Sequence, residues 1–174
     1  MASKTDSRRL TRVAEARNSL FEAWKEGVSL EKEFGESIEN LLIRVAGARW
    51  RLAAEQLRDA NLLFRSARPV YRSCVSRYCY AMYHAFRAAA LVYHSGDDHQ
   101  SHTELPRKLP VDLPSVDLWK TKLKEARLSR NRADYEPYPR TLNVWRDAAA
   151  RLRRDAIESV AATRQYLIAK GCKL

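Results

Sequence analysis

The most apolar stretch of the chain covers residues 71–93 (YRSCVSRYCYAMYHAFRAAALVY). It contains no Gly, Pro, Asp or Glu, and at 3.6 residues per turn it predicts about six turns of helix. Apolar side chains point in nearly every direction around its axis, a pattern typical of a helix that is buried on all sides. Arginines and a histidine interrupt the run, which argues against a membrane-spanning segment. We therefore expect this stretch to form the central helix of a bundle.

One face of this predicted helix is polar. Arg77, His84 and Arg87 lie at relative positions zero, seven and ten, close to one face of a helix. Ala81 and Ala88 lie between them and leave room. Such a face is expected to approach an anion or a neighbouring carboxylate. The alternative is a buried histidine bonded to a backbone carbonyl, with the two arginines extending to the surface.

Four further stretches have helical periodicity. They cover residues 6–26, 37–66, 116–130 and 141–170. Gly27 is expected to end the first of these helices, and residues 28–35 to form a charged connector. Arg68-Pro69 marks the turn before the central helix. Since Gly and Pro number only 5 and 6 in 174 residues, an all-α fold without strands is predicted.

Several residues are expected to define the ends and inner faces of these helices. Ser101 is expected to cap a short helix over residues 102–109, and Ser115 to cap the helix that follows. Pro137 and Pro139 prevent that helix from continuing. The predicted inward-facing residues of the last two helices, which include Leu128 and Leu142, are Val116, Trp119, Leu123, Ala126, Leu128, Leu142, Trp145, Ala149, Leu152, Ala156, Val160, Thr163 and Leu167.

The positive charge of the chain is concentrated in its last third. The net charge is +11, and residues 107–174 carry sixteen Lys and Arg against eight Asp and Glu, a net charge of +8. A concentrated basic field attracts polyanions, so nucleic acid is the favoured partner. The alternative is a solvated basic face that serves solubility.

The three cysteines do not form an evident metal or disulfide framework. Cys74 and Cys79 are five residues apart, about 140° around a helix, and cannot readily pair. No C-x-x-C spacing occurs. Unpaired thiols and a polar N-terminal segment without an apolar signal core predict a cytoplasmic location.

A histidine-rich loop follows the central helix. His94, His99 and His102 occur with Asp97 and Asp98 within nine residues. Imidazole and carboxylate groups both ligate divalent ions, but the spacing matches no zinc motif, and loop histidines are more often solvated. We therefore expect neither a bound metal nor a cofactor.

Three motifs occur in order along the chain. They are S-R-Y-C-Y-A-M-Y-H-A-F-R-A-A-A-L at Ser76–Leu91, Q-S-H at Gln100–His102 and R-N-R-A-D-Y at Arg130–Tyr135. The combination resembles the HEPN superfamily over about residues 38–170. The resemblance implies an up-and-down bundle of four to five long helices that commonly dimerises, here residues 36–174, with residues 1–35 as an N-terminal helical extension.

The resemblance also implies a catalytic site, from which the sequence departs. Many members are metal-independent ribonucleases in which a histidine follows the motif arginine by four to six residues. Arg130 and Asn131 are present, but no histidine occurs after His102. Tyr135 is a poor base at neutral pH, so His84 or His102 would have to accept the proton if folding or dimerisation brings it near Arg130.

The candidate residues are therefore those of the motifs and the basic segments. The candidate catalytic residues are Arg130, Asn131, His84, His102, Asp134 and Tyr135. The candidate RNA-binding residues are Arg77, Arg87, Arg132, Arg146, Arg153 and Arg154. A structural alternative for the motif at Arg130–Tyr135 is an Arg130–Asp134 ion pair that locks the helix end, with Tyr135 filling the end of the bundle.

Two functions follow from this reading. The first is a ribonuclease-like effector of a toxin–antitoxin or antiviral defence system. The second is a non-catalytic module that binds nucleotide or RNA, or that docks a nucleotidyltransferase partner. A homodimer is expected in both cases, and the missing motif histidine leaves open whether the protein is an enzyme.

Overall fold

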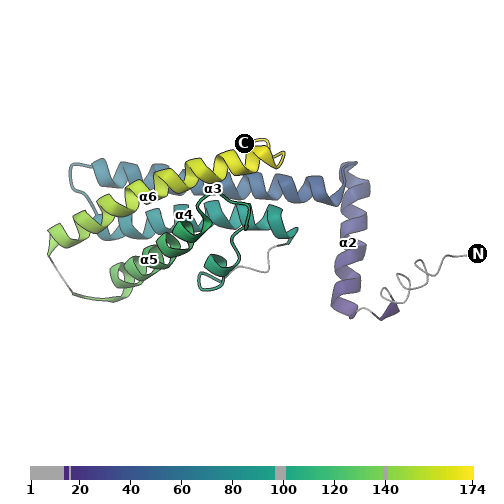
Figure 1. Cartoon of the computed structure of the whole chain (residues 1–174), viewed down its shortest axis with the longest axis horizontal. Coiled ribbons are helices and arrows are strands. Elements are labelled where there is room, and N and C mark those ends of the chain that lie inside the picture. The colour runs from purple at the N-terminus through teal and green to yellow at the C-terminus, as the bar shows by residue number, and fades with distance from the viewer. Residues whose placement is uncertain (1–13, 16, 97–100, 139–140) are drawn as a thin grey trace, which may run out of the picture. The chain divides into compact units, whose positions relative to one another are not determined.

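A computed structural model describes residues 14–15, 17–96, 101–138 and 141–174. The helices are α2 (Asn18–Phe34), α3 (Ile38–Arg65), α4 (Tyr71–His94), the short 3₁₀ helix η1 (Leu105–Arg107), α5 (Val116–Tyr135) and α6 (Leu142–Ala169). The described residues contain no strand, so the predicted all-α bundle fold is confirmed (Figure 1). The chain divides into two compact units, residues 1–41 and 42–174.

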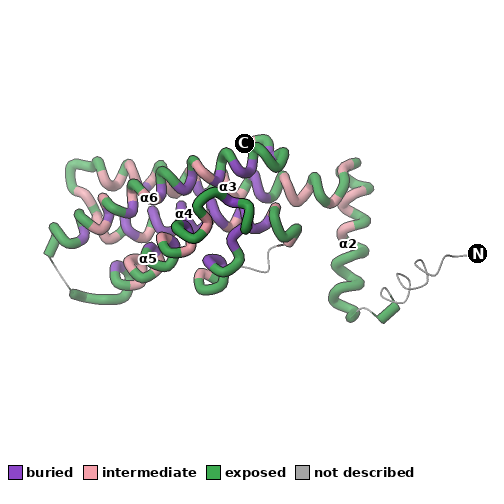
Figure 2. The backbone as a smooth tube through the Cα atoms, viewed as in Figure 1, coloured by how far each residue is buried: buried purple, intermediate pink, exposed green. Residues whose placement is uncertain are grey.

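Helix α4 is the centre of the second unit, as its apolar pattern predicts. Its buried side chains include Tyr78, Met82 and Phe86, each fully enclosed. Helix α4 packs against both α5 and α6, and many of its residues are buried (Figure 2). The Phe86 and Trp119 rings lie 5.3 Å apart between α4 and α5. Burying one large apolar side chain contributes about 1.5–3 kcal/mol to the stability of the folded protein. The many buried side chains of α4 therefore make a large contribution to the stability of the bundle.

The remaining helices are attached to this core by specific polar contacts. Trp50 Nε1 of α3 donates a hydrogen bond to the carbonyl oxygen of Val160 in α6, 3.2 Å away. Tyr78 OH of α4 donates to Asn61 Oδ1 of α3 at 3.0 Å. Near the other end of α3, the buried Gly47 lies against Leu174 at the chain end. These contacts fix α3 against α4 and α6.

The three cysteines are unpaired and buried. Burial raises the pKa of Cys74 to about 11 and that of Cys79 to about 12. The pKa of Cys172 is also raised by burial. All three are therefore protonated, unreactive thiols at neutral pH.

The first predicted helix was placed wrongly where the structure describes it. Gly27 lies inside α2 and does not end it, and residues 28–34, predicted to be a connector, are helical. The helix instead ends at Gly35, whose φ of 63° is left-handed and whose N–H donates to the Glu31 carbonyl. A mid-helix glycine costs only about 1 kcal/mol, which the helix-compatible residues around it offset. The predicted residues 6–13 lie outside the described part of the chain.

The ends of the later helices also differ from expectation. Helix α5 continues five residues beyond Arg130 to Tyr135, because the sequence contains nothing that stops a helix before Pro137. Ser115 is the N-cap residue, but with a φ of 58° it makes no side-chain capping bond within the described chain. Leu128 and Leu142, predicted to face inward, are 56% and 61% exposed. The predicted helix over 102–109 is reduced to η1.

Candidate functional site

Two tyrosines and two histidines meet at one edge of α4. His102, from the loop before η1, stacks on the Tyr83 ring with centroids 3.9 Å apart and planes 22° apart. His84 meets the edge of the same ring at 5.1 Å and lies nearly parallel to Tyr80 at 6.2 Å. Tyr80 in turn contacts His102 edge-on at 5.6 Å. The fold thus brings together two imidazoles that are separated in the sequence, and we call these four residues the His–Tyr cluster.

Arg130 of α5 also contacts this cluster. Its guanidinium lies 5.6 Å from the centre of the Tyr80 ring and forms an ion pair with Asp134 at 3.5 Å, one turn along α5. The Arg130 side chain is only 13% exposed. Among the described residues, neither the buried Arg130 Nε nor the buried His84 Nδ1 has a hydrogen-bond partner. His84, His102 and Arg130 therefore surround one tyrosine pair within a single chain.

Burial and nearby positive charges determine the protonation of both imidazoles. Burial, followed by the charges of Arg49 and Arg87, lowers the pKa of His84 to about 4. Burial, followed by the charges of Arg130 and other arginines, lowers the pKa of His102 to about 4. Both rings are therefore neutral at pH 7, in a site rich in guanidinium groups. An anion bound there would favour the protonated rings and raise both pKa values.

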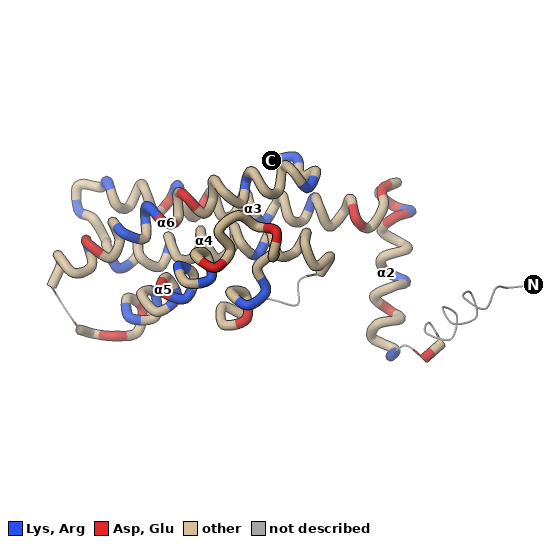
Figure 3. The backbone as a smooth tube through the Cα atoms, viewed as in Figure 1, with Lys and Arg blue, Asp and Glu red and all other residues tan. Residues whose placement is uncertain are grey.

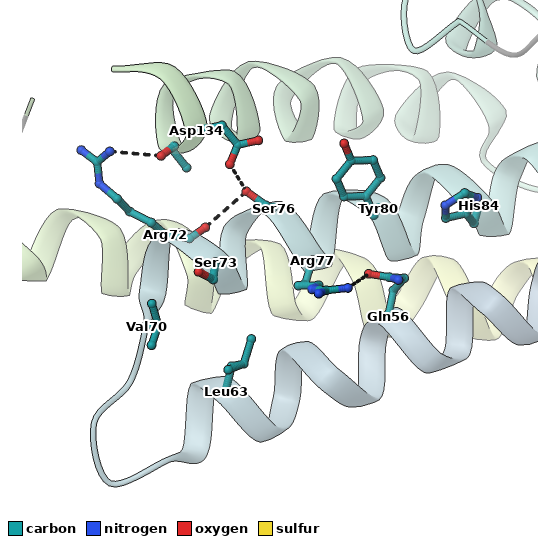
Figure 4. A pocket seen from close by; sticks show the side chains of 11 residues that line it. Gln56, Leu63, Val70, Arg72, Ser73, Ser76, Arg77, Tyr80, His84 and Asp134 are labelled. Atoms are coloured by element: carbon teal, nitrogen blue, oxygen red, sulfur yellow. Dashed lines mark hydrogen bonds between the residues drawn. The ribbon is translucent and has the colours of Figure 1, made fainter. Parts of the chain in front are cut away.

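Residues of α4 hold the end of α5 next to the cluster. Ser76 Oγ donates a hydrogen bond to Asp134 Oδ1. Arg72 Nη1 donates to the carbonyl oxygens of Ala133 at 3.1 Å and Glu136 at 2.7 Å. These carbonyls belong to the last turn of α5 and to its C-cap residue, Glu136, where carbonyls lack helical partners. Arg72 thus caps α5, while Ser76 fixes the carboxylate that pairs with Arg130 (Figure 4).

A groove of about 820 Å³ opens beside the cluster, between α3, α4 and α5. Its lining includes Gln56, Ser76, Arg77, Tyr80, His84 and Asp134. Figure 4 shows Asp134 reaching towards α4 from α5, with Gln56 and Arg77 on the other side, near α3. Gln56, Ser76, Tyr80 and Tyr83 were not predicted as site residues from the sequence. A helical spacing of four residues through Ser76, Tyr80 and His84 was the signal that could have identified two of them.

Asn131 and Tyr135 do not line this groove. Asn131 lines a separate hollow of about 720 Å³ with Arg132, Glu136 and Arg151. Because α5 is helical here, Asn131 is turned about 100° from Arg130. Tyr135 is 75% exposed, so it does not fill the end of the bundle as the structural alternative proposed. Its ring still lies 6.0 Å from the Arg130 guanidinium.

The six candidate RNA-binding arginines have different surroundings. Arg77 Nη1 donates to Gln56 Oε1 at 2.9 Å, and Arg87 Nη1 donates to Tyr83 OH at 3.1 Å. Arg153 of α6 contacts α3. Its Nε donates to Asn61 Oδ1 at 2.8 Å, and its guanidinium lies 5.6 Å from the centre of the Phe64 ring.

The other three arginines lie on the surface. Arg132 pairs with Glu136 and Arg146 with Asp147, each at 3.4 Å, and Arg154 is exposed. Surface pairs of this kind are weak and easily exchanged. Lys and Arg side chains predominate over acidic ones along α5 and α6 (Figure 3).

The fold and the site together define an all-α bundle protein whose central helix carries a histidine–tyrosine site opposed by an arginine. The family model of the HEPN domain matches residues 46–167, which is well over half of the chain, and the chain belongs to this family. HEPN domains are generally associated with nucleotide- and RNA-related functions and often dimerise. No curated protein matches the chain. In the part of the chain that the structure describes, every helix is too short or too polar to cross a membrane.

Proposed function

We propose that the protein binds RNA and cleaves it without a metal, as an effector of a toxin–antitoxin or antiviral defence system. The observation that carries the proposal is the approach of His84, His102 and Arg130 to one pair of tyrosines. Two imidazoles and a guanidinium are the groups that phosphodiester transfer requires for proton movement and charge stabilisation. They stand in for the histidine that is missing after Arg130.

The proposed reaction uses these groups on an RNA strand in the groove. Arg130 binds the scissile phosphate and stabilises the charge that develops on its oxygens. One neutral imidazole accepts the proton of the 2′-hydroxyl as its oxygen bonds to phosphorus. The bond from phosphorus to the 5′-oxygen breaks, and that oxygen takes a proton from the second imidazole, protonated when RNA binds. The products are a 2′,3′-cyclic phosphate and a 5′-hydroxyl.

A second candidate is a non-catalytic module that binds RNA or nucleotide, or docks a nucleotidyltransferase. One observation favours it. The pKa values of His84 and His102 are lowered to about 4, which makes both rings weak bases and leaves neither protonated at pH 7 without a bound anion. The orientation of Asn131 towards a different hollow is consistent with this reading.

Incubation of the purified protein with RNA, with and without EDTA, distinguishes the two candidates. The ribonuclease proposal expects cleavage that persists in EDTA, with products ending in a cyclic phosphate. His84→Gln and His102→Gln should each reduce cleavage by at least about a hundredfold, as loss of a general acid or base does. His94→Gln is the matched control, because His94 lies outside the cluster, with Nε2 3.0 Å from the Lys108 carbonyl. Binding without cleavage supports the non-catalytic module.

We also propose a homodimer in the cytoplasm. The unpaired thiols support a reducing compartment. The dimer is proposed because HEPN domains often dimerise. Sedimentation velocity tests the oligomeric state. Co-purification with a nucleotidyltransferase encoded by a neighbouring gene would identify the partner that the toxin–antitoxin reading expects.

A further inference from the structure

The groove next to the His–Tyr cluster is larger than a phosphate site needs to be. Its volume of about 820 Å³ lies within the range of roughly 300–1,000 Å³ typical of small-molecule sites. It extends along α4 from His84 and Tyr80 past Ser76 and Arg77. Arg130 does not line the groove, but it pairs with Asp134 and contacts Tyr80, which do. A nucleotide whose phosphate contacts Arg130 therefore has space for its base in the groove, where the Tyr80 ring provides a stacking surface. This inference rests on the proposed binding of RNA.

The wall near α3 presents mainly hydrogen-bond donors. Arg77 Nη1 donates to Gln56 Oε1 at 2.9 Å, and this bond orients the Gln56 amide so that its oxygen is turned to the guanidinium. The groups left for a ligand are the Gln56 amide N–H bonds, the remaining N–H bonds of Arg77 and one lone pair of Gln56 Oε1. This wall suits the edge of a base that carries two adjacent acceptors.

The wall near α5 presents an acceptor. Asp134 is held by Ser76 and by Arg130, yet its side chain is still 32% exposed. A carboxylate has about four lone-pair sites, so the two existing contacts leave acceptor capacity towards the groove. This wall suits the edge of a base that carries N–H groups.

Guanine carries groups that complement both walls. It carries the acceptors O6 and N7 on one edge, and an exocyclic N2 amino group on another. Adenine places its N6 amino group beside N7, which would bring a donor against the donors of Gln56 and Arg77. Repulsion between donors is one source of discrimination between two bases.

We propose that the groove between α3, α4 and α5 is a guanine-recognising subsite, in which Gln56 and Arg77 bind the O6/N7 edge, Asp134 accepts from the N–H edge and Tyr80 stacks on the ring. The protein would thus select RNA at guanine positions. Gln56 and Arg77 determine this specificity and take no part in the proton transfers.

Two labelled oligouridine strands, identical except for one central guanine or adenine, test the subsite by fluorescence anisotropy on the full-length protein. The guanine strand should bind on the order of tenfold more tightly, as expected for one well-placed two-bond contact to a base. Gln56→Ala, which keeps the charge of the groove, should remove this preference while leaving the adenine strand's affinity nearly unchanged. Arg154→Gln is the control, and should weaken both strands equally.

The outcomes separate this inference from the proposed function. Equal affinity for the two strands, or a guanine preference that survives in Gln56→Ala or in Arg77→Gln, overturns the subsite and leaves RNA binding intact. Failure of the wild-type protein to bind either strand overturns the RNA-binding function and the subsite together. Circular dichroism of each variant establishes that the helices are retained.

Discussion

His102 lies face to face with Tyr83, their ring centroids 3.9 Å apart. This contact joins the loop before η1 to the central helix and places one imidazole on the same tyrosine that His84 meets edge-on. Burial, together with the charges of nearby arginines, keeps the pKa of His102 well below its ordinary value. The cluster is therefore held neutral until an anion enters.

Arg130→Ala is expected to abolish RNA cleavage while retaining most RNA binding. Loss of one oriented charge at the reacting phosphate costs on the order of a hundredfold or more in rate, whereas binding is spread over many basic side chains. Rates in single-turnover assays and affinities from filter binding measure the two effects. Arg132→Ala is the matched control, because Arg132 is exposed and paired only at the surface with Glu136. Equal loss of cleavage in both variants would contradict the role of Arg130.

Acidification is expected to destabilise the protein through His84 and His102. Their pKa values are about 4 in the folded protein against 6.5 for an ordinary histidine. Between these values the unfolded chain binds more protons than the folded protein, so stability is fully present above about pH 6.5 and falls as the pH drops towards 4. The melting temperature should therefore decrease more steeply in the wild type than in the double variant His84→Gln/His102→Gln. Parallel curves would show that these rings titrate normally.

Charge reversal at two neighbouring arginines should have different effects. From the sequence, Arg153 and Arg154 were both expected to bind RNA. Arg153 instead bonds to Asn61 and covers Phe64, so Arg153→Glu should cost about 1–3 kcal/mol of stability. Arg154→Glu, at an exposed site, should leave the melting temperature unchanged but weaken RNA binding and reduce its salt dependence. Thermal melts combined with a salt titration of binding distinguish the two.

Arg72→Gln is expected to loosen the end of α5. It removes the donor that bonds to the Ala133 and Glu136 carbonyls and the cation above the Trp145 ring, 4.4 Å away. Two lost bonds from a charged donor should cost about 2–4 kcal/mol. Hydrogen exchange should accelerate in the last turn of α5 and leave the centre of α4 protected. Unchanged exchange in α5 would mean that this cap contributes little.

The helices could be predicted from the sequence where one signal dominates. The apolar run at 71–93 corresponds to α4 within one residue, because a helix buried on all sides leaves no ambiguity of face. Gly27 misled the prediction, since the cost of a glycine within a helix is small and neighbouring residues decide whether the helix continues. The exposure of Leu128 and Leu142 depends on which surfaces α5 and α6 bury, and this depends on packing between helices.

The candidate site could be predicted only in part. The common face of α4 and the motif at Arg130 pointed to the same place, and the structure brings His84, His102 and Arg130 to one tyrosine pair; their catalytic roles remain predictions. The position of Asn131 could not be anticipated, because it depends on α5 remaining helical beyond Arg130. The stack of His102 on Tyr83 depends on the path of a loop, which no spacing in the sequence specifies.

The buried thiols also have a practical consequence for experiments on this protein. Maleimide reagents react with exposed thiolates, whereas Cys74, Cys79 and Cys172 are enclosed and have raised pKa values. A single cysteine introduced at an exposed position, such as Gln165 of α6, can therefore carry a fluorophore or spin label without removal of the native cysteines. Distances between such labels would then report how two copies of the bundle assemble in solution.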